Sequence, residues 1–297
     1  MSRRWLWQGT RVALLLLAAL GGLALGLWWR GHQQPRPAAQ AVIAFLDVGD
    51  GDCTLIRTVS GVTILLDTGS AETAPAVVRA LHRFHVRTLD LLVLASPDAK
   101  SLGGVPAVLD AFPVRAAWVT GAQSGGAARV AALEAIGRHR VPARTVYAGD
   151  HLQIGAATFW AALWPPATGP RAHLDSVVYE LNFGATRVVF AGPARAEEEA
   201  YLISARGEAM GCDDGSCTDL VLQAAAVGAD GTASDELLTQ AAPAVVVASC
   251  SAQNPPAPGV LHRLGASGAA LWRTDTQGTV IVLTDGREAP TVTAARL

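Results

Sequence analysis

From residue 42 onward, short apolar runs alternate with turns rich in Gly, Asp and Pro. Apolar runs bounded by such turns are typical of buried strands, whereas apolar residues spaced three and four apart are typical of helices. The runs predict strands at 42–48, 53–58, 62–66, 89–94, 116–120, 143–146, 156–163, 177–183, 187–191, 220–224, 244–248, 270–274 and 279–284. The helical spacing predicts helices at 74–84, 105–111, 126–138, 196–204, 234–240 and 259–266. Strands mixed with helices along the whole chain favour an α/β sandwich over an all-β barrel.

The N-terminal segment has a different pattern. Residues 12–29 carry no charge over 18 positions, about the length that a helix needs to cross a bilayer, and tryptophans stand at both ends of the run. Three arginines precede the run and one follows it, so the positive-inside rule places the N-terminus in the cytoplasm. We therefore expect a cytoplasmic segment at 1–11, a single-pass anchor in the cell membrane at 12–29, a polar linker at 30–41 and one extracytoplasmic domain at 42–297.

A cleaved secretory signal is the alternative for this segment. Ala39-Gln40-Ala41 has the small-residue form of a cleavage site, but it lies ten residues beyond Trp29. In a signal peptide the cleavage site follows closely behind a shorter apolar core. We favour the retained anchor, which makes the lipid bilayer a partner of residues 12–29.

Composition and charge narrow the choice of partners. The chain has 297 residues, of which 51% are hydrophobic and 16% charged, so a disordered chain is excluded. The first 30 residues hold four arginines and no acid, which leaves 19 basic against 25 acidic residues in the rest. A domain that binds nucleic acid through phosphates normally presents a basic face. We therefore do not expect nucleic acid as a partner and expect another membrane or extracytoplasmic protein instead.

The four cysteines do not form a metal motif. Cys212 and Cys217 flank a polar turn that could close a small disulfide loop, and the free-thiol alternative stays open. Structural zinc needs four soft ligands, and no histidine lies near this pair. Cys53 and Cys250 lie in predicted strands, where a free cysteine is usually a small buried hydrophobe.

Several turn motifs occur in a recognisable order. They are Phe45-Leu46-Asp47-Val48-Gly49-Asp50-Gly51-Asp52, Ile64-Leu65-Leu66-Asp67-Thr68-Gly69 and Leu89-Asp90-Leu91-Leu92-Val93-Leu94, followed by the hairpin at 176–192 and the segments at 243–249, 260–268 and 272–286. This series resembles the ComEC/Rec2-type metallo-β-lactamase-fold domain, the soluble domain of competence proteins that take up DNA. The resemblance covers about residues 42–287. It implies an αββα sandwich, here with one N-terminal transmembrane helix.

The metal-binding segment of that family is altered. The family has His-x-Asp-x-Asp-His directly after the strand that ends at Leu94, and two histidines and one aspartate of this segment bind metal. Here the segment reads Ser96-Pro97-Asp98-Ala99-Lys100-Ser101. Both histidine positions are serine, the second aspartate is Lys100, and only Asp98 is retained. An ammonium group at a metal position repels the cation.

The family's other ligand positions are also replaced. The Gly-Asp after the central hairpin is Gly192-Pro193, the His-His-Gly-Ser segment aligns with 226–229, and a late His-Pro falls at 255–256. We therefore expect no cofactor, neither zinc nor another divalent metal. The positions of the vestigial cleft are Asp67, Ser96, Asp98, Lys100 and Ser101, and none is assigned as a catalytic or metal residue.

Three weaker interpretations concern other polar residues. The carboxylates Asp47, Asp50, Asp52, Asp67 and Asp98 could form a hard-cation site, but aspartates at strand ends usually bond backbone N–H groups, and we favour that role. Ser96 or Ser101 could act as a nucleophile with Lys100 as base, although a loop lysine usually faces solvent. His82 and His85 have helical metal-site spacing but no third ligand in reach.

These observations lead to a binding or assembly subunit that has the fold of a hydrolase without its ligands, so we lean away from an enzyme. Two alternatives remain. The first is a metal-dependent phosphodiesterase or nuclease like that of the ComEC/Rec2 family. The second is a DNA-binding protein related to DNA uptake, which the acidic balance after residue 30 disfavours.

Overall fold

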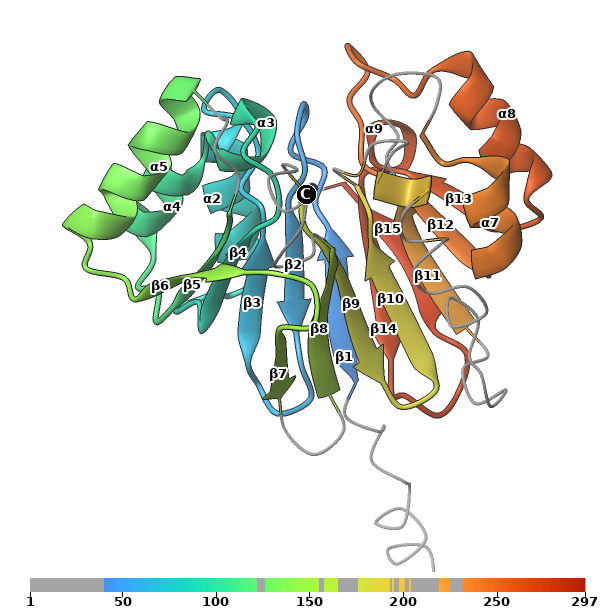
Figure 1. Cartoon of the computed structure of the whole chain (residues 1–297), viewed down its shortest axis with the longest axis horizontal. Helices are drawn as coiled ribbons and strands as arrows, with labels where there is room; N and C mark the ends of the chain where they lie inside the picture. The colour runs from blue at the N-terminus through green and yellow to red at the C-terminus, as the bar shows by residue number, and fades with distance from the viewer. Residues whose placement is uncertain are drawn as a thin grey trace, which may run out of the picture. The chain divides into compact units, whose positions relative to one another are not determined.

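Two β-sheets pack face to face, and helices cover their outer faces (Figure 1). The computed structural model describes residues 40–121, 126–154, 158–164, 176–192, 194, 198–200, 203, 219–224 and 232–296. Residues 40–297 form one compact unit. The mixed α/β fold predicted from the sequence is confirmed.

The first sheet has the strand order β15-β14-β1-β2-β3-β4-β5-β6. Its strands are β1 (Ala41–Phe45), β2 (Thr54–Arg57), β3 (Thr63–Leu66), β4 (Leu91–Leu94), β5 (Ala117–Thr120), β6 (Ala143–Val146), β14 (Thr279–Thr284) and β15 (Thr291–Ala295). Pairing is antiparallel from β15 to β3 and parallel from β3 to β6.

The second sheet has the order β13-β12-β11-β10-β9-β8-β7. Its strands are β7 (His151–Ile154), β8 (Thr158–Trp164), β9 (Val178–Phe183), β10 (Thr186–Phe190), β11 (Asp219–Ala224), β12 (Val245–Ala248) and β13 (Ala270–Arg273). Strands β10 to β13 pair in parallel, and the remaining pairs are antiparallel.

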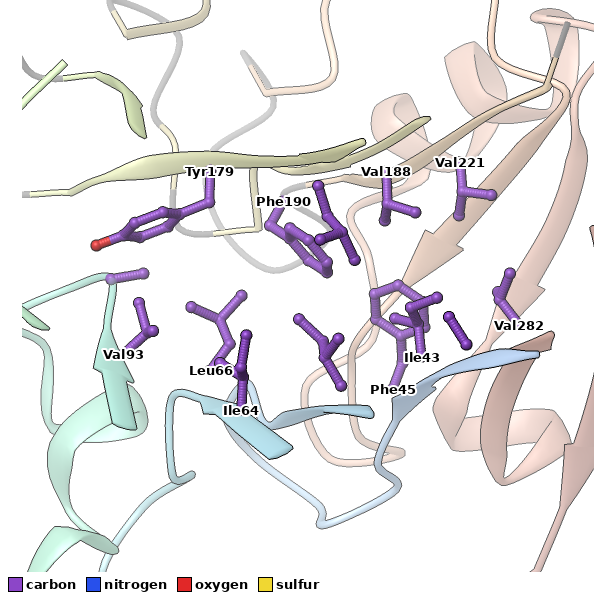
Figure 2. Close-up of a cluster of buried hydrophobic side chains, with 14 of the residues drawn as sticks. Ile43, Phe45, Ile64, Leu66, Val93, Tyr179, Val188, Phe190, Val221 and Val282 are labelled. Atoms are coloured by element: carbon purple, nitrogen blue, oxygen red, sulfur yellow. The ribbon is translucent and has the colours of Figure 1, made fainter. Parts of the chain in front are cut away.

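Apolar side chains fill the space between the two sheets (Figure 2). Alternate residues of a strand point to opposite faces, so Ile43 and Phe45 of β1 point towards the second sheet. The rings of Phe45 and Phe190 lie 6.1 Å apart across this interface. Burial of each side chain of this size stabilises the folded state by about 1.5–3 kcal/mol, so this core stabilises the packing of the two sheets on each other.

The outward-pointing residues of both sheets pack against helices. Ala44, Leu55 and Leu92 belong to a second core under the helices that follow β3, β4 and β5, and Val189 and Leu222 belong to a third core under the C-terminal helices. The helices are α2 (Ala74–Arg83), α3 (Ala99–Leu102), α4 (Val105–Ala111), α5 (Gly126–Arg138), α7 (Asp235–Ala241), α8 (Pro258–Ala266) and α9 (Thr274–Gln277). The layers are therefore helix, sheet, sheet, helix.

Strands β7 and β15 and the short helices α3 and α9 were not predicted. Three of the four residues of β7 are exposed, and β15 is partly or fully exposed along its length, so neither shows a continuous apolar run. Helices of four residues are too short to show helical spacing.

Several predictions lie outside the described residues. They are the anchor at 12–29, most of the linker, the pair Cys212 and Cys217, and most of the helix at 196–204. Within the described part of the chain, no helix is long and apolar enough to span a bilayer.

Gly103 and Gly104, directly after α3, allow this segment to pack closely on the loop that follows β3. A Cβ on Gly104 would lie 2.1 Å from the carbonyl oxygen of Thr68, whereas a Cβ on Gly137 in α5 would meet no atom within 4 Å. We expect Gly104→Ala to lower the free energy of unfolding by about 2 kcal/mol or more, since the clash is with backbone.

The matched control, Gly137→Ala, should raise stability by about 0.5–1 kcal/mol because alanine is the better helix former. Thermal unfolding of both variants measures the difference. Equal stability of the two variants would contradict this account of the loop packing.

Candidate functional site

Polar side chains gather at one edge of the sandwich, beyond the carboxyl ends of the strands that run parallel to one another. Strands β1, β3 and β4 of the first sheet end here, and so do β10, β11 and β12 of the second sheet. In open α/β sheets this is the edge where ligands bind. We call the following residues the polar edge: Asp50, Asp52, Asp67, Lys100, Ser101, Gln223, Ser249 and Asn254.

Asp67 follows β3 directly and is 1% exposed. Its Oδ1 accepts a hydrogen bond from the N–H of Ala95 at 2.8 Å, and the Ser101 hydroxyl donates to the same carboxyl group. Burial raises the pKa of Asp67 well above its ordinary value, while the Ala95 N–H lowers it and the nearby charge of Asp52 raises it. Its φ of 57° is left-handed, a conformation that Asp and Asn tolerate better than most residues.

Backbone hydrogen bonds join three loops around this carboxylate. The N–H and the hydroxyl of Thr68 both donate to the carbonyl oxygen of Ser101, each at 2.8 Å. The N–H of Gly69 donates to the carbonyl oxygen of Asp52 at 2.9 Å. The loops after β1, β3 and β4 are therefore fixed relative to one another.

Asp52 connects the first sheet to the second. The side-chain amide of Gln223 in β11 donates to Asp52 Oδ1 at 3.3 Å and to the hydroxyl of Ser249 at 3.1 Å. Burial raises the pKa of Asp52 to about 6, against the lowering effect of hydrogen bonds from Ser249 and Gln223. This carboxyl group therefore exchanges its proton near neutral pH, as acid–base groups of active sites do.

Lys100 forms an ion pair across the polar edge. Its Nζ lies 2.9 Å from Asp50 Oδ2, and the side-chain amide of Asn254 donates to Asp50 Oδ1 at 3.2 Å. The approach needs a glycine beside Asp50, because a Cβ on Gly51 would lie 2.2 Å from the carbonyl oxygen of Lys100. The side chains of Lys100 and Asp50 are 49% and 40% exposed, so the pair contributes at most about 1 kcal/mol.

The serines that stand at histidine positions have structural contacts. Ser96 is 1% exposed, and its hydroxyl accepts a hydrogen bond from the N–H of Asp98 at 3.2 Å. The side chain of Asp98 is exposed. The ammonium of Lys100 binds Asp50 and not a serine hydroxyl, so the geometry does not assemble a Ser–Lys nucleophile.

Three of the histidines that the structure describes, His82, His85 and His139, contact residues outside the polar edge. The ring of His82 packs on Phe112 with centroids 4.9 Å apart, while His85 lines a groove at the opposite edge of the first sheet. His139 pairs with Asp110. His82 and His85 therefore do not form a metal-binding pair.

Of the five turn carboxylates, Asp67 bonds a backbone N–H as expected, but Asp52 bonds side chains from the second sheet. Gln223, Ser249 and Asn254 were not recognised in the sequence. A glutamine inside the apolar strand Leu220-Val221-Leu222-Gln223-Ala224 is the signal that could have found the first of them, because a buried amide needs a partner.

A metal centre needs several His, Cys, Asp or Glu side chains close together. Among the described residues, no group of three or more His, Cys, Asp or Glu side chains could hold a metal ion. Positions 193 and 226–229, where two of the family's other ligand segments align, lie outside the described part. The described residues do not fit a dinuclear centre, and we derive no step through one.

No protein-family model and no curated protein matches this chain. Solved structures do match. CmlA, a diiron β-hydroxylase from Streptomyces venezuelae, shares 14% identity over 88% of this chain and 55% of its own, with a TM-score of 0.52. This chain thus spans about half of CmlA.

Two further matches have lower TM-scores, and no argument depends on them. A metallo-β-lactamase of Cronobacter sakazakii with a HARLDQ motif has 15% identity over 47% of this chain and 54% of its own, with a TM-score of 0.34. A Parabacteroides distasonis protein described as a metal-dependent hydrolase has 11% identity over 78% and 92%, with a TM-score of 0.43. The match to CmlA supports the mixed α/β fold and, at 14% identity, shows the fold alone.

The expectation that no zinc or other divalent metal is bound is wrong by this comparison. CmlA is described as a diiron enzyme, so a structural neighbour of this chain is a metal protein. The absence of histidines at the aligned positions was not a sufficient reason to expect no metal. This chain has the fold of a metal protein, CmlA, at only 14% sequence identity, so the metal ligands need not lie in the same sequence motifs.

The buried carboxylate of Asp67 supports a stability prediction. Asp67→Ala removes the acceptor of the Ala95 N–H and places alanine at a positive φ, so we expect a loss of about 3–5 kcal/mol in the free energy of unfolding. Asp67→Asn keeps an acceptor oxygen and a residue that tolerates this φ, so it should cost less than about 1 kcal/mol. Urea unfolding compares them, and equal losses would contradict the role of Asp67.

Asp52 should make stability depend on pH. Its folded pKa of about 6 exceeds the ordinary value of 3.8, so the folded state binds the proton more tightly. The stabilisation is therefore complete below about pH 4 and is lost as the pH rises through 6. We expect Asp52→Asn to remove this part of the pH dependence and to raise stability at pH 7.5 by at most about 3 kcal/mol.

The matched control is Asp98→Asn, which changes an exposed carboxylate of the same edge. Unfolding is measured from pH 4 to pH 8 for both variants. Because Asp67 also has a raised pKa, part of the slope should remain in Asp52→Asn. A wild-type stability that stays flat from pH 4 to pH 6.5, or a slope as steep in Asp52→Asn as in the wild type, would contradict the assignment.

Proposed function

We propose that this protein is a membrane-tethered, extracytoplasmic subunit that binds or assembles with another protein through its polar edge and does not hydrolyse what it binds. The observation that carries the proposal is the ion pair of Lys100 with Asp50. In the ComEC/Rec2-like segment that this sequence resembles, the position of Lys100 holds an aspartate. The ammonium group takes the carboxylate of the neighbouring loop as its partner.

The surrounding contacts support a binding role. Asn254 and Lys100 bind the Asp50 carboxylate, and Gln223 and Ser249 bind Asp52, so six side chains are fixed in two hydrogen-bonded groups. Fixed donors and acceptors on rigid elements suit recognition of a partner. The apolar run at 12–29 supports the tether.

A second candidate function is metal-dependent hydrolysis of a phosphodiester. The observation in its favour is the pair of carboxylates Asp52 and Asp67. Burial raises the pKa of both groups, the charge of Asp52 raises the pKa of Asp67 further, and carboxylate oxygen atoms are ligands for hard cations. CmlA, which matches this fold, is described as a diiron enzyme, and this also favours it.

Hydrolysis of bis-p-nitrophenyl phosphate by the full chain in mild detergent separates the two functions. The protein is incubated with Mg²⁺, Mn²⁺, Zn²⁺ or Fe²⁺, and its metal content is measured in the same samples. We expect turnover no faster than that of the Asp52→Asn and Asp98→Ala variants, whatever the metal content. Metal-dependent turnover that is lost by 100-fold or more in Asp52→Asn would establish the hydrolase and contradict the proposal.

A further inference from the structure

The edge of the sandwich opposite the polar edge contains a basic groove. We define the basic groove as the hollow of about 500 Å³ between the β2–β3 hairpin, the connection from α2 to β4, and the start of β5. Its charged lining residues are Arg57, Arg87, Arg115 and Asp90, and His85 also lines it. The domain as a whole is acidic, so an excess of cations here is a local feature.

The hydrogen bonds of the groove leave its positive charge uncompensated. The one lining acid, Asp90, accepts from the N–H of Thr63 at 2.9 Å and lies 3.3 Å from Arg115. Arg57 donates to the neutral carbonyl oxygen of Phe84 at 2.7 Å, which fixes its guanidinium without cancelling its charge. Arg87 is exposed and makes no hydrogen bond or ion pair with the described residues. The groove therefore suits an anion with several oxygen acceptors, such as a phosphate group.

The chain enters the domain beside this groove. Strand β1 begins at Ala41, and in the register of β1 with β2 the next residue, Val42, lies opposite Arg57 (Figure 1). The predicted linker at 30–41 can extend over no more than about 40 Å. A membrane anchor before that linker would be attached to the domain at this edge and not at the polar edge.

The hairpin that forms one wall of the groove has an exposed apolar tip. Val59 lies in the turn of this hairpin and is 42% exposed. The acids Asp285 and Glu288 follow β14, which lies on the far side of β1 from β2, so they do not line the groove. An apolar tip beside basic side chains is the arrangement that favours contact with an anionic lipid surface.

We propose that the basic groove binds the phosphate group of anionic membrane lipids and thereby orients the domain with its polar edge directed away from the bilayer. The strands of the first sheet separate the two edges by about 20 Å, at about 3.3 Å per residue. The polar edge would then be presented to a partner beyond the headgroup layer. This inference rests on the membrane tether of the proposed function.

Hydrogen exchange of the full chain in lipid nanodiscs tests the inference. One set of discs contains phosphatidylcholine only, and the other also contains phosphatidylglycerol. We expect amide exchange at 58–62 and 85–88 to be slower by about fivefold or more in the anionic discs, since one arginine near an anionic surface contributes a factor of this size. High salt should reduce the difference.

The matched variants are Arg87→Glu in the groove and Arg138→Glu at the exposed end of α5, which change the net charge equally. The difference between discs should vanish in Arg87→Glu and persist in Arg138→Glu. Equal exchange in both discs, or loss of the difference in both variants, would overturn the inference. Equal protection by inorganic phosphate in detergent would assign the groove to a free anion instead of a lipid.

The same experiment tests the membrane anchor separately from the groove. If the protein is released from the discs, the anchor of the proposed function is wrong, and the exchange comparison is repeated with phosphatidylglycerol vesicles added to the released chain. Slower exchange at the same two segments would still support the groove, and unchanged exchange would overturn it.

Discussion

The hydrogen bond from the N–H of Ala95 to the buried carboxyl group of Asp67 is the contact on which the polar edge depends. It joins the end of β3 to the residue that follows β4, and these two strands are parallel neighbours. Thr68, Gly69 and Ser101 then extend the connection to the loop that contains Asp52. Burial makes the charged form of Asp67 costly and raises its pKa, and the hydrogen bonds from Ala95 and Ser101 offset part of that cost.

The loop packing at the polar edge does not depend on metal-ligand side chains. Thr68 donates its N–H and its hydroxyl to the main-chain carbonyl oxygen of Ser101, so this contact does not require histidine at position 101. Gly104 is required by the close approach of Thr68 and not by a metal. Lys100 is accommodated because Asp50 supplies a carboxylate from the adjacent loop. The similarity of fold to CmlA therefore does not say which residues of this chain could bind a metal.

Much of the fold could be predicted from the sequence because its inner strands are continuous apolar runs between Gly and Asp turns. Exposed strands such as β7 could not, since their residues have no apolar face to reveal them. The loop positions of the candidate site were predictable from Asp67 and from Ser96 to Ser101. The partners Gln223, Ser249 and Asn254 were not, because they come from β11 and from the loop after β12, which are distant in sequence and approach only through sheet packing. The expectation of no metal went beyond what missing motifs can establish.

The central claim is that the polar edge binds a protein partner. The most direct measurement places a photo-crosslinking amino acid at Ala99, exposed beside Lys100, and at Arg138 as the control, in the full chain in native membranes. The account predicts one discrete adduct from position 99 that is absent from position 138 and is reduced by Asp50→Ala, which removes the partner of Lys100 and Asn254. Identical adducts from both positions, or none from position 99, would contradict it.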